Sequence, residues 1–324
     1  MTASNKQETA KLWNATAARS QPVEAFRTAQ RRVLSRYGIA AKSRFVDVPA
    51  IGGTAHVLVV GAGPPLVMVI GGSIPAALWA PLMPQLQGYT LYAMDLPGFG
   101  LTEAVSYQTA TMRSTVVGFL AQVLDGIGVE RSRFVTHSQG SLWTTWLSLD
   151  QPERVAAQVH IGSTAHILGT SPPLPMRVMS IPPVGRLLLK LQSPSLRQVE
   201  RVFAMVHEDV SEIPEIRDVL LACERLPAYG GSMLALMNAV MRVGRVRPEI
   251  ALVGEQLALV SHPVQLIWGD RDPFGSVSVA RRAAAFLPDA ELHVVSGGHA
   301  PWFNRPEEVG ALARRFLADH RDKV

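Results

Sequence analysis

From residue 44 onward, short apolar segments alternate with segments whose apolar residues recur at helical spacing. Four of the apolar segments are PPLVMVIGG (64–72), YTLYAMD (89–95), RFVTH (133–137) and PVQLIWG (263–269). Continuous apolar runs of this length, ended by glycine or a polar turn, are typical of strands buried on both faces. Because strands that alternate with helices form parallel sheets, the pattern predicts an α/β fold with a mostly parallel central sheet flanked by helices.

The predicted sheet opens with a hairpin, and helices are expected between the later strands. RFVDVPA (44–50) and AHVLVVG (55–61) are rich in β-branched residues, and Gly52-Gly53 supplies a turn between them. Helical spacing is clearest in TMRSTVVGFLAQVLDGIG (111–128), in residues 277–286 and in the segment that begins at Pro306.

The alternation stops between residues 164 and 252. This stretch includes the proline-rich segment TSPPLPMRVMSIPP (170–183) and continues as amphipathic helical pieces that carry several methionines. We predict that residues 164–252 form a helical cap inserted between two parts of the α/β core, residues 44–163 and 253–324. Residues 1–43 precede the core and are predicted to be an N-terminal helical extension.

The composition favours a soluble globular protein. Hydrophobic residues make up 48% of the chain and charged residues 18%, which suits a sizeable core. No apolar run reaches the roughly 18 residues of a membrane span, and the N-terminal segment lacks the apolar stretch of a secretory signal. The single cysteine, Cys223, precludes an internal disulfide framework. We therefore expect a cytoplasmic protein without a membrane span.

The net charge of +5 does not indicate a nucleic-acid partner. The densest basic run, RTAQRRVLSR (27–36), is interpreted as a solvated helix face, and no reader motif accompanies it. The sequence contains no P-loop, no HExxH and no paired Cys/His spacing, and GAGPPL (61–66) lacks the third glycine of a dinucleotide loop. We expect no metal and no cofactor.

Polar residues follow four of the predicted strands at their carboxyl ends. They are Gly71-Gly72-Ser73, Ser138, the loop 270–272 and His299. Ligands of parallel sheets bind beyond these ends, and Ser, Asp and His in this chain order form the arrangement used for acyl transfer on α/β sheets. A serine hydroxyl needs a base to become a nucleophile, and a carboxylate orients the imidazole. Asp270 and Asp272 both lie where that carboxylate is needed.

The chain resembles the α/β-hydrolase fold superfamily, in particular its capped, esterase-like serine hydrolases. Five motifs carry the resemblance over about residues 44–163 and 251–320: GGS (71–73), DLPGFG (95–100), THSQG (136–140), WGDRD (268–272) and GGHAPWFNRPEEV (297–309). It implies Ser138 as nucleophile, His299 as base and Asp272, four positions after the tryptophan, as acid. It also implies an oxyanion hole formed by the backbone N–H groups of Ser73 and Gln139.

Two positions depart from the family's pattern. Thr136 stands where the turn around the nucleophile usually begins with Gly, and Gly71 stands where the oxyanion loop usually carries His. Asp95 is interpreted as a carboxylate that shapes the loop before Pro97-Gly98. The other histidines are weaker candidates for the base: His293 lies inside a strand, His262 precedes one, and His137 lies along the turn with no free strand-end position.

The expected function is cofactor-free hydrolysis of a carboxylic ester with an apolar acyl or aryl group, through an acyl-serine intermediate. Met233, Met237 and Trp302 are candidate substrate-binding residues, although methionines at helical spacing equally suit core packing. Carbon–carbon bond hydrolases, perhydrolases and acyltransferases use the same triad, and a non-catalytic small-molecule receptor is the alternative of another class. The partner is a small-molecule substrate in each case, and the sequence leaves the oligomeric state open.

Overall fold

The computed structural model describes residues 21–162, 167 and 169–320. At its centre lies one eight-stranded sheet with the order β1-β2-β4-β3-β5-β6-β9-β10. The pairs β1–β2 and β2–β4 are antiparallel, and the other five pairs are parallel, as predicted. The strands are β1 (Lys42–Val48), β2 (Gly53–Gly61), β3 (Pro65–Val69), β4 (Thr90–Met94), β5 (Ser132–His137), β6 (Val155–Ile161), β9 (Val264–Gly269) and β10 (Ala290–Val295).

Helices flank this sheet and explain why its central strands are buried throughout. Every residue of β5, β6 and β9 is buried, because both faces of these strands are covered. The helix α4 packs against β3, β5 and β6, whereas α11 packs against β9 and β10, and α12 against β6 and β9. The flanking helices are α3 (Met112–Ile127), α4 (Gln139–Asp150), α11 (Val277–Phe286) and α12 (Pro306–Asp319).

The chain leaves the sheet after β6 and returns to the neighbouring strand, β9, about one hundred residues later. Helices fill most of this excursion. An isolated bridge joins Ile167 to Leu252, and we call the segment between these two residues the cap. The predicted boundary at Thr164 lies outside the described residues. The cap contains α5 (Leu174–Met179), α6 (Pro182–Leu191), α7 (Leu196–Met205), α8 (Pro214–Glu224), α9 (Tyr229–Val240) and the two-residue strands β7 (Met241–Arg242) and β8 (Arg245–Val246), and α10 (Gly254–Leu257) follows it.

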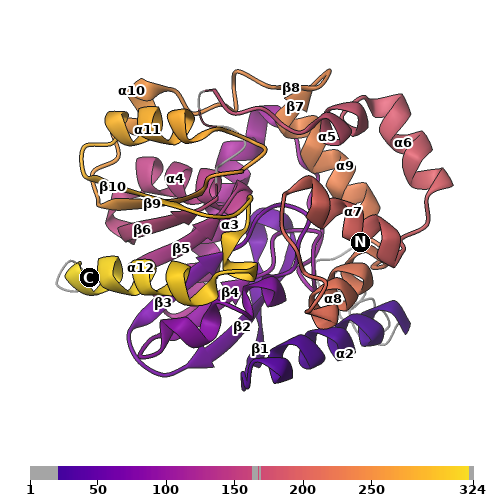
Figure 1. Cartoon of the computed structure of the whole chain (residues 1–324), viewed down its shortest axis with the longest axis horizontal. Coiled ribbons are helices and arrows are strands. Elements are labelled where there is room, and N and C mark those ends of the chain that lie inside the picture. Colours follow the sequence, from indigo (N-terminus) through magenta and orange to yellow (C-terminus); the bar gives the residue numbers. More distant parts are fainter. Residues whose placement is uncertain (1–20, 163–166, 168, 321–324) are drawn as a thin grey trace, which may run out of the picture.

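The described part of the predicted N-terminal extension, residues 21–43, contains one helix, α2 (Gln21–Arg36), and ends in the first two residues of β1. The helix α2 lies beside α8 of the cap (Figure 1). Its apolar side, with Phe26 and Val33, is fully buried, whereas Arg31 and Arg32 are exposed, as expected for a solvated basic face. Arg36 also pairs with Glu215 of α8 at 3.1 Å. Residues 1–20 of the predicted extension lie outside the described part. No helix among the described residues is long and apolar enough to cross a membrane.

The loop after β4 is held by a fully buried carboxylate, Asp95. Its Oδ1 accepts a hydrogen bond from the Ala76 amide at 2.7 Å, and its Oδ2 accepts one from the Leu101 amide at 3.0 Å. The Oδ2 atom also lies 2.7 Å from Nδ1 of His56 on β2. These contacts confirm the loop-shaping interpretation of Asp95.

Replacing Asp95 by Ala should destabilise the fold strongly. The buried N–H group of Ala76 and the partly buried N–H group of Leu101 would lose their acceptor, which should lower the free energy of unfolding by about 3 kcal/mol. Urea denaturation followed by circular dichroism measures this change. Asp47→Ala, at an exposed position on β1, is the control and should change the free energy by less than about 0.5 kcal/mol. An Asp95→Ala protein as stable as this control would contradict the account of the loop.

Candidate active site

Ser138 lies in the sharp turn between β5 and α4, at the carboxyl edge of the parallel strands. Its backbone angles are φ +50° and ψ −115°, a left-handed conformation that non-glycine residues rarely adopt. Gly140 makes the turn possible, because a Cβ atom there would collide with the carbonyl oxygens of Val69 and Ile70 on the neighbouring strand. The turn therefore holds Ser138 in a strained conformation beside the end of β3.

Thr136, the first departure from the family's pattern, is accommodated without left-handed strain. It is fully buried as the penultimate residue of β5, and its Oγ1 lies 2.9 Å from Oγ of Ser141 and 3.3 Å from the carbonyl oxygen of Val159. The hydroxyl therefore ties the start of the turn to α4 and to β6. A β-branched residue fits here because its polar atom has partners on both sides.

Gly71, the second departure, follows from the position of His137. A Cβ atom at Gly71 would lie 2.7 Å from Nδ1 of His137 and 3.2 Å from Cβ of Ser138. Any side chain at position 71 would therefore displace one or both of these residues. The adjacent Ser73 has φ +62°, and the hydroxyl of Tyr229 on α9 donates a hydrogen bond to its carbonyl oxygen at 3.1 Å.

The structure joins Asp272 to His299. Oδ2 of Asp272 lies 2.9 Å from Nδ1 of His299, and both side chains are at least 95% buried. The other carboxylate oxygen, Oδ1, accepts the Phe274 amide at 2.9 Å. A carboxylate on Nδ1 leaves Nε2 as the proton-accepting nitrogen of a neutral imidazole, which is the arrangement that the predicted role of His299 as a base requires.

Asp270 points to a different partner. Its Oδ1 accepts a hydrogen bond from the Gly297 amide at 3.0 Å, and 47% of its side chain is exposed. It therefore connects the loop after β9 to the loop after β10 rather than contacting the imidazole. Of the two aspartates that the sequence places in this loop, the geometry favours Asp272 as the partner of His299.

His137, which the sequence made a weaker candidate for the base, has its ring in the lining of the cavity beside Ser138. The ring centroid lies 4.6 Å from that of His299 and 4.7 Å from that of Trp302. Burial lowers the pKa of His137 well below its usual value, and the neighbouring His299 adds to that shift. His137 therefore lines the site as an uncharged imidazole near pH 7.

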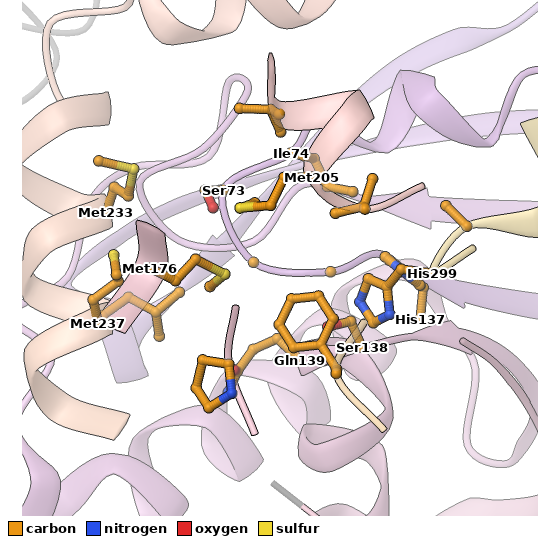
Figure 2. A pocket seen from close by; sticks show the side chains of 18 of the residues that line it. Ser73, Ile74, His137, Ser138, Gln139, Met176, Met205, Met233, Met237 and His299 are labelled. Atoms are coloured by element: carbon orange, nitrogen blue, oxygen red, sulfur yellow. The ribbon is translucent and has the colours of Figure 1, made fainter. Parts of the chain in front are cut away.

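A cavity of about 160 Å³ separates the core from the cap, with Ser138, His299, Ser73 and Gln139 in its lining. Figure 2 shows Ser138 and His299 towards one end and the methionines of α5 and α9 towards the other. The cap side of the cavity is apolar. It is lined by Pro172, Met176, Val202, Phe203, Met205, Val206, Leu220, Met233, Leu236, Met237, Val240 and Met241.

The three candidate substrate-binding residues lie in different places. Met233 and Met237 line the cavity from α9. Trp302 does not, which corrects the expectation of substrate contact: it is fully buried, its Nε1 donates to the carbonyl oxygen of Leu78 at 2.9 Å, and its ring packs 4.6 Å from that of Trp79. The edge-to-face contact between the rings of Trp302 and His137 helps to hold His137 in place.

Two neighbours of the site were missed by reasoning from sequence. Phe274 packs its ring 4.2 Å from that of His299, and Tyr229 of the cap donates a hydrogen bond to the carbonyl oxygen of Ser73. Phe274 follows Asp272 by only two residues, so proximity in sequence was an available signal. No local signal identified Tyr229, because its contact spans 156 positions. The described residues include no group of three or more His, Cys, Asp or Glu side chains arranged to hold a metal ion.

Comparisons with known proteins agree with this geometry. A profile of the alpha/beta hydrolase fold family matches residues 64–189. A 2-hydroxy-6-oxononadienedioate/2-hydroxy-6-oxononatrienedioate hydrolase from Paraburkholderia phymatum is 28% identical over 86% of this chain and 96% of its own length. A pimeloyl-[acyl-carrier protein] methyl ester esterase from Shewanella oneidensis is 25% identical over 82% and 96%.

A solved carboxylesterase from Bacillus subtilis superposes with a TM-score of 0.74 at 19% identity, covering 93% of this chain and 99% of its own. Together with the sheet order and the positions of Ser138 and His299, these matches place the chain in the superfamily that its motifs predict. The chain belongs to the α/β-hydrolase fold superfamily, and it is an α/β hydrolase.

The two aspartates after β9 should differ sharply when each is replaced by Asn. Asp272→Asn should lower kcat for p-nitrophenyl acetate by about 10⁴-fold, because the amide favours the wrong tautomer of His299. Asp270→Asn should lower kcat by less than about tenfold, since the Asp270 side chain contacts the Gly297 amide and Arg271 rather than His299. Steady-state kinetics on both variants decides the assignment, and the reverse ranking would transfer the role to Asp270.

Gly71→Ala should impair the site without unfolding the protein. The added methyl would push His137 or Ser138 away, and a displacement of about 1 Å at the reacting groups can cost about a hundredfold in rate. We expect a tenfold to hundredfold fall in kcat/KM, measured beside the melting temperature. Gly231→Ala on α9, where a methyl meets open space, is the matched control and should retain wild-type kinetics.

Proposed function

We propose that the protein hydrolyses a carboxylic ester with a small apolar acyl or aryl group, through an acyl-serine intermediate. The observation that carries the proposal is the combination of the strained Ser138, the buried Asp272–His299 hydrogen bond and one small apolar cavity that Ser138 and His299 both line. A strained turn, a buried ion pair or an apolar cavity by itself is compatible with a purely structural role. Together they provide a nucleophile, an oriented base and a binding site for the acyl group.

In the proposed reaction, Oγ of Ser138 attacks the ester carbonyl carbon while Nε2 of His299 takes the hydroxyl proton. The backbone N–H groups of Ser73 and Gln139 stabilise the tetrahedral oxyanion, and Asp272 stabilises the imidazolium. His299 then gives its proton to the leaving alcohol. In the second half, His299 removes a proton from water as the water oxygen attacks the acyl carbon. The bond between that carbon and Oγ of Ser138 then breaks, the carboxylic acid leaves, and His299 returns the proton to Oγ of Ser138.

The cavity limits the size of the proposed substrate. Its volume of about 160 Å³ is similar to that of a cavity that holds benzene. A short acyl chain or a single aromatic ring would fill the methionine end while the carbonyl lies at Ser138. The flexible thioether side chains of Met233 and Met237 would adapt to differences in its shape.

Carbon–carbon bond hydrolysis is the second candidate, because relatives with 24–28% identity carry that activity in their names. The substrate names of those relatives end in dioate, so each substrate has two carboxylates. Among the described residues, no Lys or Arg lines the cavity of this chain. Since an unpaired carboxylate in an apolar cavity is costly, the lining favours a neutral ester over a dianionic substrate.

A series of p-nitrophenyl esters tests the proposed substrate class. Each methylene that enters the apolar end should add up to about 0.8 kcal/mol, so kcat/KM should rise up to about fourfold per carbon from acetate onward. It should then fall once the chain outgrows the cavity. A 2-hydroxy-6-oxo-dienedioate offered in parallel should be cleaved far more slowly than the best ester, and the opposite preference would establish the second candidate.

Met237→Ala should move the optimum of that series towards longer esters, because it enlarges the apolar end of the cavity. Met179→Ala is the matched control, since this partly buried methionine also belongs to the cap but does not line the cavity. It should leave the optimum unchanged and lower only the melting temperature. An optimum that stays in place in both variants would show that Met237 has only a packing role.

A further inference from the structure

One turn of the cap, Val206–Glu208, which follows α7, contacts both the loop that carries Asp272 and the loop that carries His299. This turn lies on the chain nearly one hundred residues from His299. The carbonyl oxygen of Val206 accepts a hydrogen bond from the amide of His299 itself, at 2.9 Å. The cap is thus bonded directly to the backbone of the proposed base.

The two glycines before His299 allow this close approach. A Cβ atom at Gly298 would collide with the carbonyl oxygen of Val206 and lie 2.7 Å from that of His207. The glycines of the GGH sequence therefore permit the contact with the cap as well as the turn after β10. A larger residue at position 298 would separate the turn from the loop.

Glu208 fixes the same loop from its other side. Its Oε1 accepts the amides of Gly298 at 2.9 Å and Ala300 at 3.0 Å, which flank His299, and its side chain is buried. Burial raises the pKa of Glu208 to about 7, and the hydrogen bonds from Ala300 and Gly298 oppose that shift. Glu208 does not line the substrate cavity. Its observed partners belong to the loop that carries the base.

His207 reaches the loop of the acid. It has φ +58°, a left-handed conformation, and its Nδ1 donates a hydrogen bond to the carbonyl oxygen of Arg271 at 2.7 Å. Arg271 immediately precedes Asp272. Three consecutive residues of the cap therefore bond to both members of the Asp272–His299 pair through adjacent backbone, and the middle residue is strained to do so.

We propose that the turn Val206–Glu208 is a positioning element of the active site, with Glu208 as its principal positioning residue. It holds the loops of Asp272 and His299 at the separation that their hydrogen bond requires, so the cap aligns the triad as well as covering the substrate. The predicted effect of this turn on kcat rests on the proposed function, whereas its predicted effect on the Asp272–His299 hydrogen bond does not. Both consequences can be measured.

The kinetic test compares Glu208→Ala with Glu208→Gln on the best p-nitrophenyl ester. Ala removes the acceptor of two amides, and kcat should fall about tenfold to hundredfold through misalignment. KM should change less than about threefold, because Glu208 lies outside the cavity lining. Gln keeps an oxygen where Oε1 lies, so its kcat should remain within about threefold of the wild-type value.

The matched control is Glu224→Ala. Glu224 is another buried carboxyl of the cap, and burial raises its pKa to about 7 as well, but it lies on α8 and outside the cavity lining. The Glu224→Ala variant should have a lower melting temperature and an unchanged kcat. If Glu208→Ala fails to fold, His207→Gly replaces it: glycine relieves the left-handed backbone, so kcat should fall through the lost bond to Arg271 while the melting temperature is maintained.

A second readout needs no substrate. The proton on Nδ1 of His299, hydrogen-bonded to Asp272, should give a low-field proton NMR signal that disappears in Asp272→Ala. We expect this signal in the wild type, Glu208→Gln and Glu224→Ala, and its loss or broadening in Glu208→Ala. An intact signal with unchanged kcat in Glu208→Ala would overturn the inference, as would a Gln variant as impaired as the Ala variant. A wild type that shows the signal but cleaves no ester would instead contradict the proposed function alone.

Discussion

The hydrogen bond between Asp272 and His299 is the interaction on which the rest of the site depends. It joins two loops whose strands, β9 and β10, are parallel neighbours that end in register, with Gly269 paired to Val295. The loops continue this pairing beyond the sheet, since Asp270 donates its amide to Val295 and Arg271 donates its amide to Gly297. Burial excludes water from the pair and thereby strengthens the interaction. The sheet thus places the two loops side by side, and the proposed role of the cap turn Val206–Glu208 is to align them.

Close backbone approach is the second constraint, and glycines satisfy it at three points. Gly140 lets α4 approach the end of β3, Gly71 leaves room for His137, and Gly298 lets the cap meet the loop of His299. At each point a methyl group would displace a neighbour of a proposed catalytic residue. Of the two departures from the family's pattern, Gly71 is explained by the space that His137 occupies, whereas Thr136 fits because its hydroxyl has partners on α4 and β6.

The sequence was most informative where the signal is local. Alternating apolar segments predicted the sheet, and a polar residue at the end of each strand predicted Ser138, the loop of Asp272 and His299 at one edge. The sequence was uninformative where the residues in contact lie far apart in the chain. The positions of Trp302 behind His137 and of Glu208 against the loop of His299 result from tertiary packing, and neither residue has a neighbour in sequence that signals its partner.

The central claim is that Ser138 is a nucleophile activated by the Asp272–His299 pair. Reaction with a fluorophosphonate, followed by intact-mass and peptide mass spectrometry, tests it without knowledge of the substrate. The account predicts a single adduct on Ser138 and none in Ser138→Ala, at an unchanged melting temperature. An adduct on another residue, or ester turnover that persists in a folded Ser138→Ala protein, would contradict it.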